Sequence, residues 1–286
     1  MSVYISTGGF KNLNFLETAK LFKKSGINNI ELSGGAYTGD VRKKLRLLNK
    51  LANIQLHNYF PPPKKSFVLN LASLDEKIFI RSNKHIMRSI KLCSMLGKKY
   101  YSFHAGFLCD IKPNELGKKI KKKKIFPRNV CLAKFISRIK NLSLKAKKLK
   151  VKLMIENNVL SSNNLKEFKT NPFLMADPEE CKYVLDNVPK NVGLLLDVAH
   201  LKVSSKSLNF KAKKMFDLNS ERIFGYHLSD NDGLRDSNKS FNSNSWFWKH
   251  LKKDKKYYSI EVYNDDPKEL RRLQKLTIQK LIKNFK

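Results

Sequence analysis

Eight short apolar runs, spread along the whole chain, are the feature that most constrains what this sequence can fold into. Each run is five to eight residues long and mixes aliphatic, β-branched and aromatic residues, a composition typical of buried strands. The predicted strands are residues 3–7, 29–34, 54–60, 100–106, 152–158, 193–200, 223–230 and 257–263.

Longer segments with apolar residues at helical spacing separate these runs. Asp40 is expected to cap one helix, Ser73 with Glu76 to form a capping box, and Gly97 to end that helix. Asp177 followed by Pro178 predicts a further helix start. The predicted helices cover residues 14–26, 40–52, 73–97, 129–150 and 177–188, with weaker signals at 210–216, 246–251 and from 267 onward.

Strict alternation of eight strands with helices predicts an α/β protein with a single (β/α)₈ TIM barrel domain over residues 1–286. An open doubly wound sheet is the alternative. It is less favoured because the "STGG" stretch after the first strand lacks the G-x-G-x-x-G spacing of a phosphate-binding loop.

Ionisable side chains recur near the carboxyl ends of strands two to eight. They are Glu31, His57, His104, Glu156, Asp197 with His200, His227 and Glu261. In a barrel these ends meet at one face. Since buried like charges are costly unless compensated, a divalent cation is expected there, and carboxylates with imidazoles suit Zn²⁺, Mn²⁺, Co²⁺ or Fe²⁺. Glu31 is expected to support a ligand rather than bind the ion.

The net charge of +34 has two readings. A nucleic acid or another polyanion would explain it functionally. The positive charge is mostly lysine, however, and asparagine is also abundant, which favours compositional bias of an AT-rich genome. The run Lys118 to Lys124 is read as a solvated loop.

The remaining signals indicate an ordinary soluble protein. The four cysteines are far apart and are expected to be free thiols. No secretory signal and no apolar run of about 20 residues is present, so a cytoplasmic location without a membrane partner is expected. His85 and His250 are expected at the surface, and Trp246 and Trp248 in helix packing.

The ordered motifs "LHNYF", "FHAG", "IEN", "LDVAH", "YHLSDND" and "IEVY" give the chain a resemblance to the xylose-isomerase-like barrels. That superfamily includes sugar isomerases and epimerases and the endonuclease IV type of abasic-site nuclease. In the isomerase and epimerase branch, a metal is held by residues that match Glu156, Asp197, His227 and Glu261. His200 matches the histidine that follows the strand-six aspartate.

The nuclease branch holds three zinc ions, and its ligands match a larger set. The additional positions are His57, His104, His200 and Asp236, so these residues are candidates for further metal or for substrate. A second histidine of the nuclease pattern is Asn238 here, which puts the third ion in doubt.

The first hypothesis is therefore a metal-dependent isomerase or epimerase of carbohydrate metabolism, acting on a sugar or sugar derivative. Glu156 and Glu261 would move the proton through a metal-stabilised enediolate, and His200 would orient an oxygen. Tyr59, Asn158 and Arg235 are candidate substrate-binding residues. Mn²⁺, Co²⁺, Zn²⁺ or Mg²⁺ is the expected cofactor, without an organic one.

Two other functions remain as alternatives. Zinc-dependent hydrolysis at abasic DNA would use the basic charge for affinity. A non-catalytic binding barrel is disfavoured because clustered acids destabilise a fold that does not use them. The oligomeric state is left open.

Overall fold

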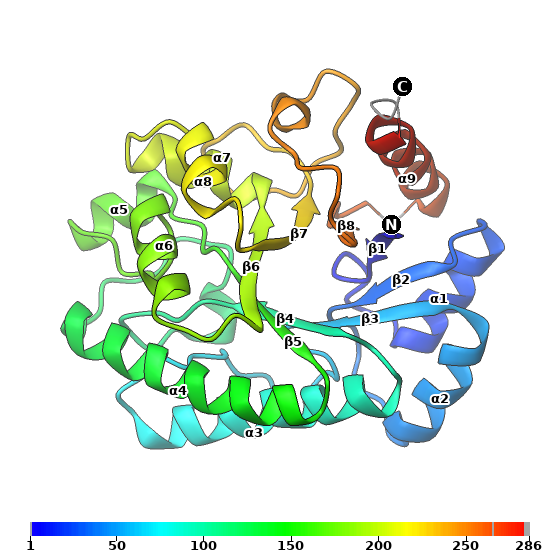
Figure 1. Cartoon of the computed structure of the whole chain (residues 1–286), viewed down its shortest axis with the longest axis horizontal. Helices are drawn as coiled ribbons and strands as arrows, with labels where there is room; N and C mark the ends of the chain where they lie inside the picture. The colour runs from blue at the N-terminus through cyan, green and yellow to red at the C-terminus, as the bar shows by residue number, and fades with distance from the viewer. Residues whose placement is uncertain (1, 265, 283–286) are drawn as a thin grey trace.

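The computed structural model describes residues 2–264 and 266–282, and in it eight parallel strands close into a barrel (Figure 1). Each strand pairs with the next along the chain, and β8 pairs with β1. The strands are β1 Ser2–Ser6, β2 Asn29–Leu32, β3 Asn53–His57, β4 Tyr100–His104, β5 Lys152–Glu156, β6 Val192–Asp197, β7 Ile223–Leu228 and β8 Tyr257–Ile260. The predicted TIM barrel is confirmed.

Helices surround the strands, as Figure 1 shows for α3 and α4 along one side. The α-helices are α1 Phe15–Lys24, α2 Val41–Leu51, α3 Glu76–Met95, α4 Arg128–Lys148, α5 Ser162–Phe168, α6 Pro178–Asp186, α7 Val198–Ser207, α8 Lys213–Asn219 and α9 Pro267–Ile282. Two short 3₁₀ helices, η1 Pro113–Glu115 and η2 Trp246–Lys249, lie in loops. Within the described ranges, no helix is long and apolar enough to cross a membrane.

Several predicted boundaries were wrong. The strands end two or three residues earlier than expected at most carboxyl ends, because the backbone turns once the inward polar residue is reached. The clearest case follows β6, where Asp197 caps α7 and the chain is already helical at Val198. Two helices, α5 and α7, had no predicted counterpart.

Two predicted caps also differ. Asp75, not Ser73, caps α3, and its carboxylate accepts from the amides of Lys77 and Ile78. Asp40 precedes α2 in a left-handed conformation and makes no side-chain cap. Asp177 does cap α6, through a 2.9 Å bond from the Glu180 amide.

Alternation along the strands sorts the side chains into two layers. Leu153 and Ile155 of β5 join the large hydrophobic core, whereas Met154 belongs to a small interior cluster with Tyr4, Leu195 and Tyr257. The next residue in the same phase as Met154 is Glu156. The strand phase therefore points the predicted site residues into the barrel.

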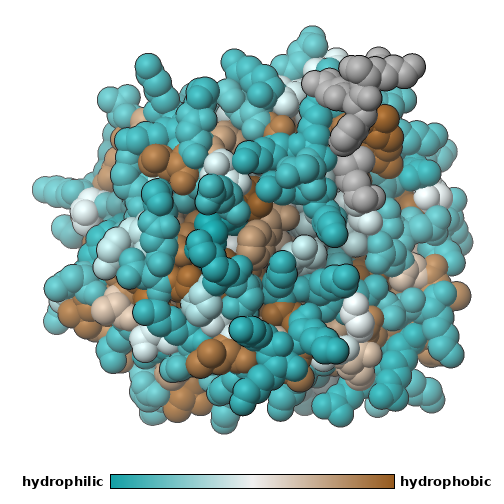
Figure 2. All heavy atoms as spheres, in the orientation of Figure 1, coloured by the Kyte–Doolittle hydropathy of each residue, from teal (hydrophilic) through white to brown (hydrophobic). Residues whose placement is uncertain are grey.

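The surface is largely polar, and the cysteines are buried. Hydrophilic side chains cover most of the face in Figure 2, with apolar residues in scattered patches. All four cysteines are buried and free. His85 is a correction to the sequence prediction, since it is buried, and its Nε2 lies 3.1 Å from the Asn58 carbonyl. His250 is half-buried and stacks on Phe216.

Candidate metal centre

Four ionisable side chains converge at the carboxyl end of the barrel, and we call them the quartet. They are Glu156, Asp197, His227 and Glu261, and each offers a ligand atom within 4.8 Å of the others. Nδ1 of His227 lies 2.9 Å from a carboxylate oxygen of Glu261, 3.1 Å from Glu156 and 3.8 Å from Asp197. Three carboxylates thus face one imidazole nitrogen.

Local structure fixes the aspartate of the quartet. Asp197 ends β6, and its Oδ1 accepts a 2.7 Å hydrogen bond from the His200 amide in the first turn of α7. The amide of Asp197 itself donates to Asn157 Oδ1 at 2.8 Å. These bonds leave Oδ2 directed toward His227. The motif "LDVAH" therefore orients a carboxylate by making it a helix cap.

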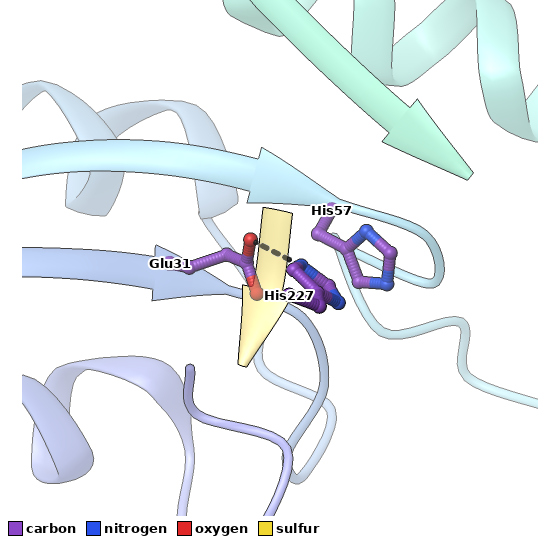
Figure 3. A group of neighbouring side chains, drawn as sticks. All are labelled: Glu31, His57 and His227. Carbon is purple, nitrogen blue, oxygen red and sulfur yellow. Dashed lines mark hydrogen bonds and ion pairs between the residues drawn. The ribbon is translucent and has the colours of Figure 1, made fainter. Parts of the chain in front are cut away.

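Glu31 holds the other side of His227, as Figure 3 shows. His227 Nε2 lies 2.9 Å from Glu31 Oε2, and the Tyr257 hydroxyl donates to the same oxygen. Since Nε2–H donates to Glu31, Nδ1 is the nitrogen that faces the carboxylates of the quartet, and it is the atom that would bind a cation after losing its proton. A carboxylate behind a histidine is the usual way that metal proteins fix the ligand tautomer.

A second group of donors adjoins the quartet and shares Glu156 with it. Glu156 Oε2 lies 3.3 Å from His57 Nε2 and 3.5 Å from His104 Nδ1. His57 Nδ1 lies 2.9 Å from the hydroxyl of Ser102, which orients the ring. The carboxylate of Glu156 therefore stands between the quartet and a pair of histidines.

His200 lies at the edge of both groups. Its Nδ1 donates to the Asn157 carbonyl at 2.8 Å, so its Nε2 faces Asp236 Oδ2 at 3.3 Å. Asn238, the position of the expected third-metal ligand in the nuclease pattern, is buried, and its Oδ1 has no hydrogen-bond partner among the described residues.

Burial and mutual charge shift the titration of these groups strongly. Burial raises the pKa of Glu156 to about 7, although His227 acts in the opposite direction. Burial would lower the pKa of His227, but Glu31 and Glu156 outweigh it and hold that pKa well above its usual range. Burial also lowers the pKa of His57 to about 3. In the metal-free protein His57 is therefore neutral, whereas His227 holds a proton among the carboxylates, and a cation bound to the quartet would displace that proton.

The donor set fits a divalent cation. Oε2 of Glu156 is buried and accepts no hydrogen bond from any described residue, although nitrogens of His57 and His104 lie 3.3 and 3.5 Å away. An unpaired carboxylate oxygen in the interior is costly without a compensating charge. Two glutamates, one aspartate and one histidine suit Zn²⁺, Mn²⁺, Co²⁺ or Mg²⁺.

Access to the centre is from one side. His104 is 27% exposed, Asp236 18% and Glu261 10%, whereas Glu156 and His227 are fully buried. Tyr263 adds a hydroxyl 3.4 Å from Glu261 Oε1. A ligand that enters the barrel mouth therefore meets Glu261 before the deeper members of the quartet.

Within the part of the chain that the structure describes, the three predicted substrate-binding residues make no hydrogen bond or ion pair with the quartet. The Tyr59 hydroxyl accepts from the Leu69 amide, and its ring packs on Phe67. The Asn158 amide donates to backbone carbonyls at 2.8 and 3.0 Å. Arg235 is exposed, and its side chain makes no hydrogen bond or ion pair with any residue that the structure describes.

Sequence reasoning missed three supporting residues: Tyr257, Ser102 and Asn157. Tyr257 lies four residues before Glu261, and Ser102 lies two residues before His104, so each side chain points to the same side of the sheet as the later residue. Extending the inward alternation back from the predicted ligands would have found them.

Comparisons with known proteins agree with this architecture. The family model described as xylose isomerase-like TIM barrel matches residues 19–275. No protein of curated function matches the sequence. Among solved structures, a D-tagatose 3-epimerase-like protein superposes with a TM-score of 0.72 at 17% identity, covering 99% of this chain and 97% of the other.

Two further solved structures are similar. The IolI protein with a bound zinc atom gives a TM-score of 0.67 at 16% identity, with 99% of each chain covered. D-psicose 3-epimerase from Clostridium cellulolyticum H10, with D-tagatose, gives 0.66 at 13% identity, with 98% of each chain covered. At such identities the likeness shows the fold alone.

Proposed function

Since the chain belongs to the xylose isomerase-like TIM barrel family, we propose that it is a divalent-metal-dependent isomerase or epimerase of a sugar or sugar derivative. The observation that carries the proposal is the approach of Glu156 and Glu261 to the same nitrogen of His227, at 3.1 and 2.9 Å. Epimerases with related folds act on ketoses such as D-tagatose and D-psicose, by their names, which supports this substrate class.

The quartet would hold the cation. When bound, the cation would supply Lewis acidity, which lowers the free energy needed to remove a proton beside a carbonyl group. Glu31 and Tyr257 would keep His227 oriented for this role.

The chain's own carboxylates would carry the proton. Glu261, at the accessible edge, or Glu156, beneath it, takes the proton from the carbon next to the carbonyl. If the other carboxyl starts protonated and delivers its own proton to the opposite face of the same carbon, that carbon is inverted and the two carboxyls have exchanged protonation states. If the first carboxyl instead returns the proton it took to the former carbonyl carbon, and a proton moves between the two neighbouring oxygens, the product is the isomer. His200 would orient a substrate oxygen.

The proposal can be tested with a panel of ketoses and aldoses. Metal-stripped protein and protein loaded with Mn²⁺, Co²⁺ or Zn²⁺ are incubated with each sugar, and products are separated chromatographically. Loaded wild type is expected to form an epimer or isomer, and Glu261→Gln is expected to lose this activity while retaining its fold. Activity that is equal in stripped and loaded protein would contradict the proposal.

A second candidate is zinc-dependent phosphodiester hydrolysis at abasic DNA. The specific observation in its favour is the group of His57 and His104 around Glu156, which offers a second cation position beside the quartet. Paired metals are common in phosphoester-cleaving enzymes. Two or three tightly bound zinc ions per chain, with nicking of an abasic duplex, would favour this candidate. One ion without nicking would favour the isomerase.

A further inference from the structure

A groove runs between α2 and α3, on the outside of the barrel. It consists of two adjoining hollows of about 940 and 590 Å³, which share Arg42, Arg46, Arg88 and Met95 in their walls. None of the lining residues belongs to the candidate metal centre. We call this feature the α2–α3 groove.

Cations form a row along each wall of the groove. On α2 the row is Arg42, Arg46 and Lys50, and on α3 it is Lys84, Arg88 and Lys91. Residues spaced by three or four lie on one face of a helix, so each row lines one side. Asp40 is the only acidic residue in the lining.

Arginine is concentrated here although the chain has only ten, against 48 lysines. Arg42, Arg46 and Arg88 are exposed and make no hydrogen bond or ion pair with any residue in 2–264 or 266–282. Six of the other arginines are committed to carbonyls or side chains of the protein, as Arg128 is to Glu180. The groove therefore presents three arginines whose donors are free to bind a carboxylate or phosphate.

The floor of the groove is aliphatic. Met87, Leu92, Met95 and Leu96 line it, and Leu47 stands on the α2 wall with 53% of its surface exposed. No aromatic side chain is present in the lining, so the groove lacks the stacking surface on which single-stranded nucleic acids depend. An apolar floor between two basic walls instead complements an amphipathic helix with acidic flanks, and methionines adapt readily to such helices.

We propose that the α2–α3 groove binds an acidic amphipathic helix of a partner protein. The apolar face of that helix lies on the methionine and leucine floor. Its Asp and Glu side chains form ion pairs with the two cation rows, with Arg42, Arg46 and Arg88 as the principal contacts. Under this proposal, part of the basic surface forms a specific binding site that is separate from the barrel mouth.

The test uses a fluorescent synthetic peptide of about 18 residues, with leucines at i, i+3, i+4 and i+7 and glutamates elsewhere. A scrambled peptide of the same composition and an oligothymidylate serve as comparison ligands. Fluorescence anisotropy is measured at about 0.15 M salt, where distant surface charges are screened. The variant Arg42→Glu/Arg46→Glu/Arg88→Glu is compared with Lys140→Glu/Lys147→Glu/Lys148→Glu, which changes three exposed α4 lysines by the same charge.

The arginine variant is expected to weaken peptide binding by about tenfold or more, and the α4 variant by much less. Leu47→Ser is expected to weaken the peptide but not the oligonucleotide. Equal weakening by both triple variants, equal binding of the scrambled peptide, or tighter arginine-dependent binding of the oligothymidylate would each overturn the proposal. The triple Arg→Gln variant provides the same comparison if charge reversal disturbs the fold, which circular dichroism detects.

Discussion

Replacement of Glu156 by glutamine should stabilise the metal-free protein while abolishing its response to metal. The carboxyl has an ordinary pKa of 4.5 in the unfolded chain, and burial raises it to about 7 in the fold. The folded state therefore holds the proton more tightly. As a consequence, the free energy of unfolding falls as the pH rises from about 4.5 to about 7, and it stays low above that.

A shift of this size corresponds to about 3 kcal/mol between the charged and neutral carboxyl. Glutamine resembles the neutral form in shape. At pH 8 the Glu156→Gln variant should therefore gain up to about 3 kcal/mol of stability over metal-free wild type, or roughly 5–10 °C in melting temperature. At pH 5 the two proteins should differ little, because wild-type Glu156 is then protonated.

Metal should reverse this order. A cation at a thousand times its Kd stabilises wild type by about 4.1 kcal/mol, which exceeds the lead of about 3 kcal/mol that the variant has at pH 8. The variant lacks the carboxylate that the quartet shares with His57 and His104. The free energy of unfolding of variant and wild type is measured by chemical denaturation followed by circular dichroism. The two proteins are compared at pH 5 and pH 8, each with and without Mn²⁺ or Zn²⁺. Glu221→Gln, at an exposed site, is the matched control. It should change neither the free energy of unfolding of the metal-free protein nor the stability gained on adding metal.

Two results would refute the reasoning. One is a metal-free Glu156→Gln protein that is less stable than wild type at pH 8, which would mean that the carboxylate is stabilising without a cation. The other is an equal gain in stability from metal in the variant and in wild type.

Three further predictions follow from the same geometry. Glu31→Gln should lower the affinity for Mn²⁺ or Zn²⁺ by about 10- to 100-fold in calorimetric titration, because Glu31 orients His227, and an unchanged affinity would contradict this role. His104→Ala should remove one zinc ion per chain in native mass spectrometry if His57, His104 and Glu156 form a second site, and leave the count unchanged if only the quartet binds. Gly225→Ala should destabilise the fold by about 1–3 kcal/mol in urea denaturation, since its new methyl group would lie 2.7 Å from the Tyr257 carbonyl; wild-type stability would show that β7 and β8 can separate locally.

The barrel was predictable because the sequence pattern that indicates it recurs eight times along the chain. Eight apolar runs in alternation with helical segments leave few architectures, so errors of two or three residues at the strand ends do not change the fold. The ends themselves were not predictable from periodicity, since "DVAH" reads as well in a strand as in a helix. Only the cap that Asp197 makes with the His200 amide decides it.

The predicted metal residues were found through their strand-end positions, and the structure brings those side chains together. The supporting residues were harder, because Tyr257 and Ser102 resemble ordinary core residues in sequence. Tyr59 and Asn158 were predicted to bind substrate, and this stays a prediction. Both residues directly follow strands, and their side-chain polar atoms form hydrogen bonds with the backbone of neighbouring loops. The path of those loops determines these bonds, and it has no periodic pattern in the sequence.

The most direct test of the proposed proton transfer is deuterium incorporation from D₂O into a panel of ketoses, followed by NMR. Wild-type protein loaded with Mn²⁺ or Co²⁺ should place deuterium on a carbon next to the carbonyl of at least one ketose, and Glu261→Gln should not. Full metal occupancy of the quartet without deuterium incorporation into any sugar of the panel would contradict the account.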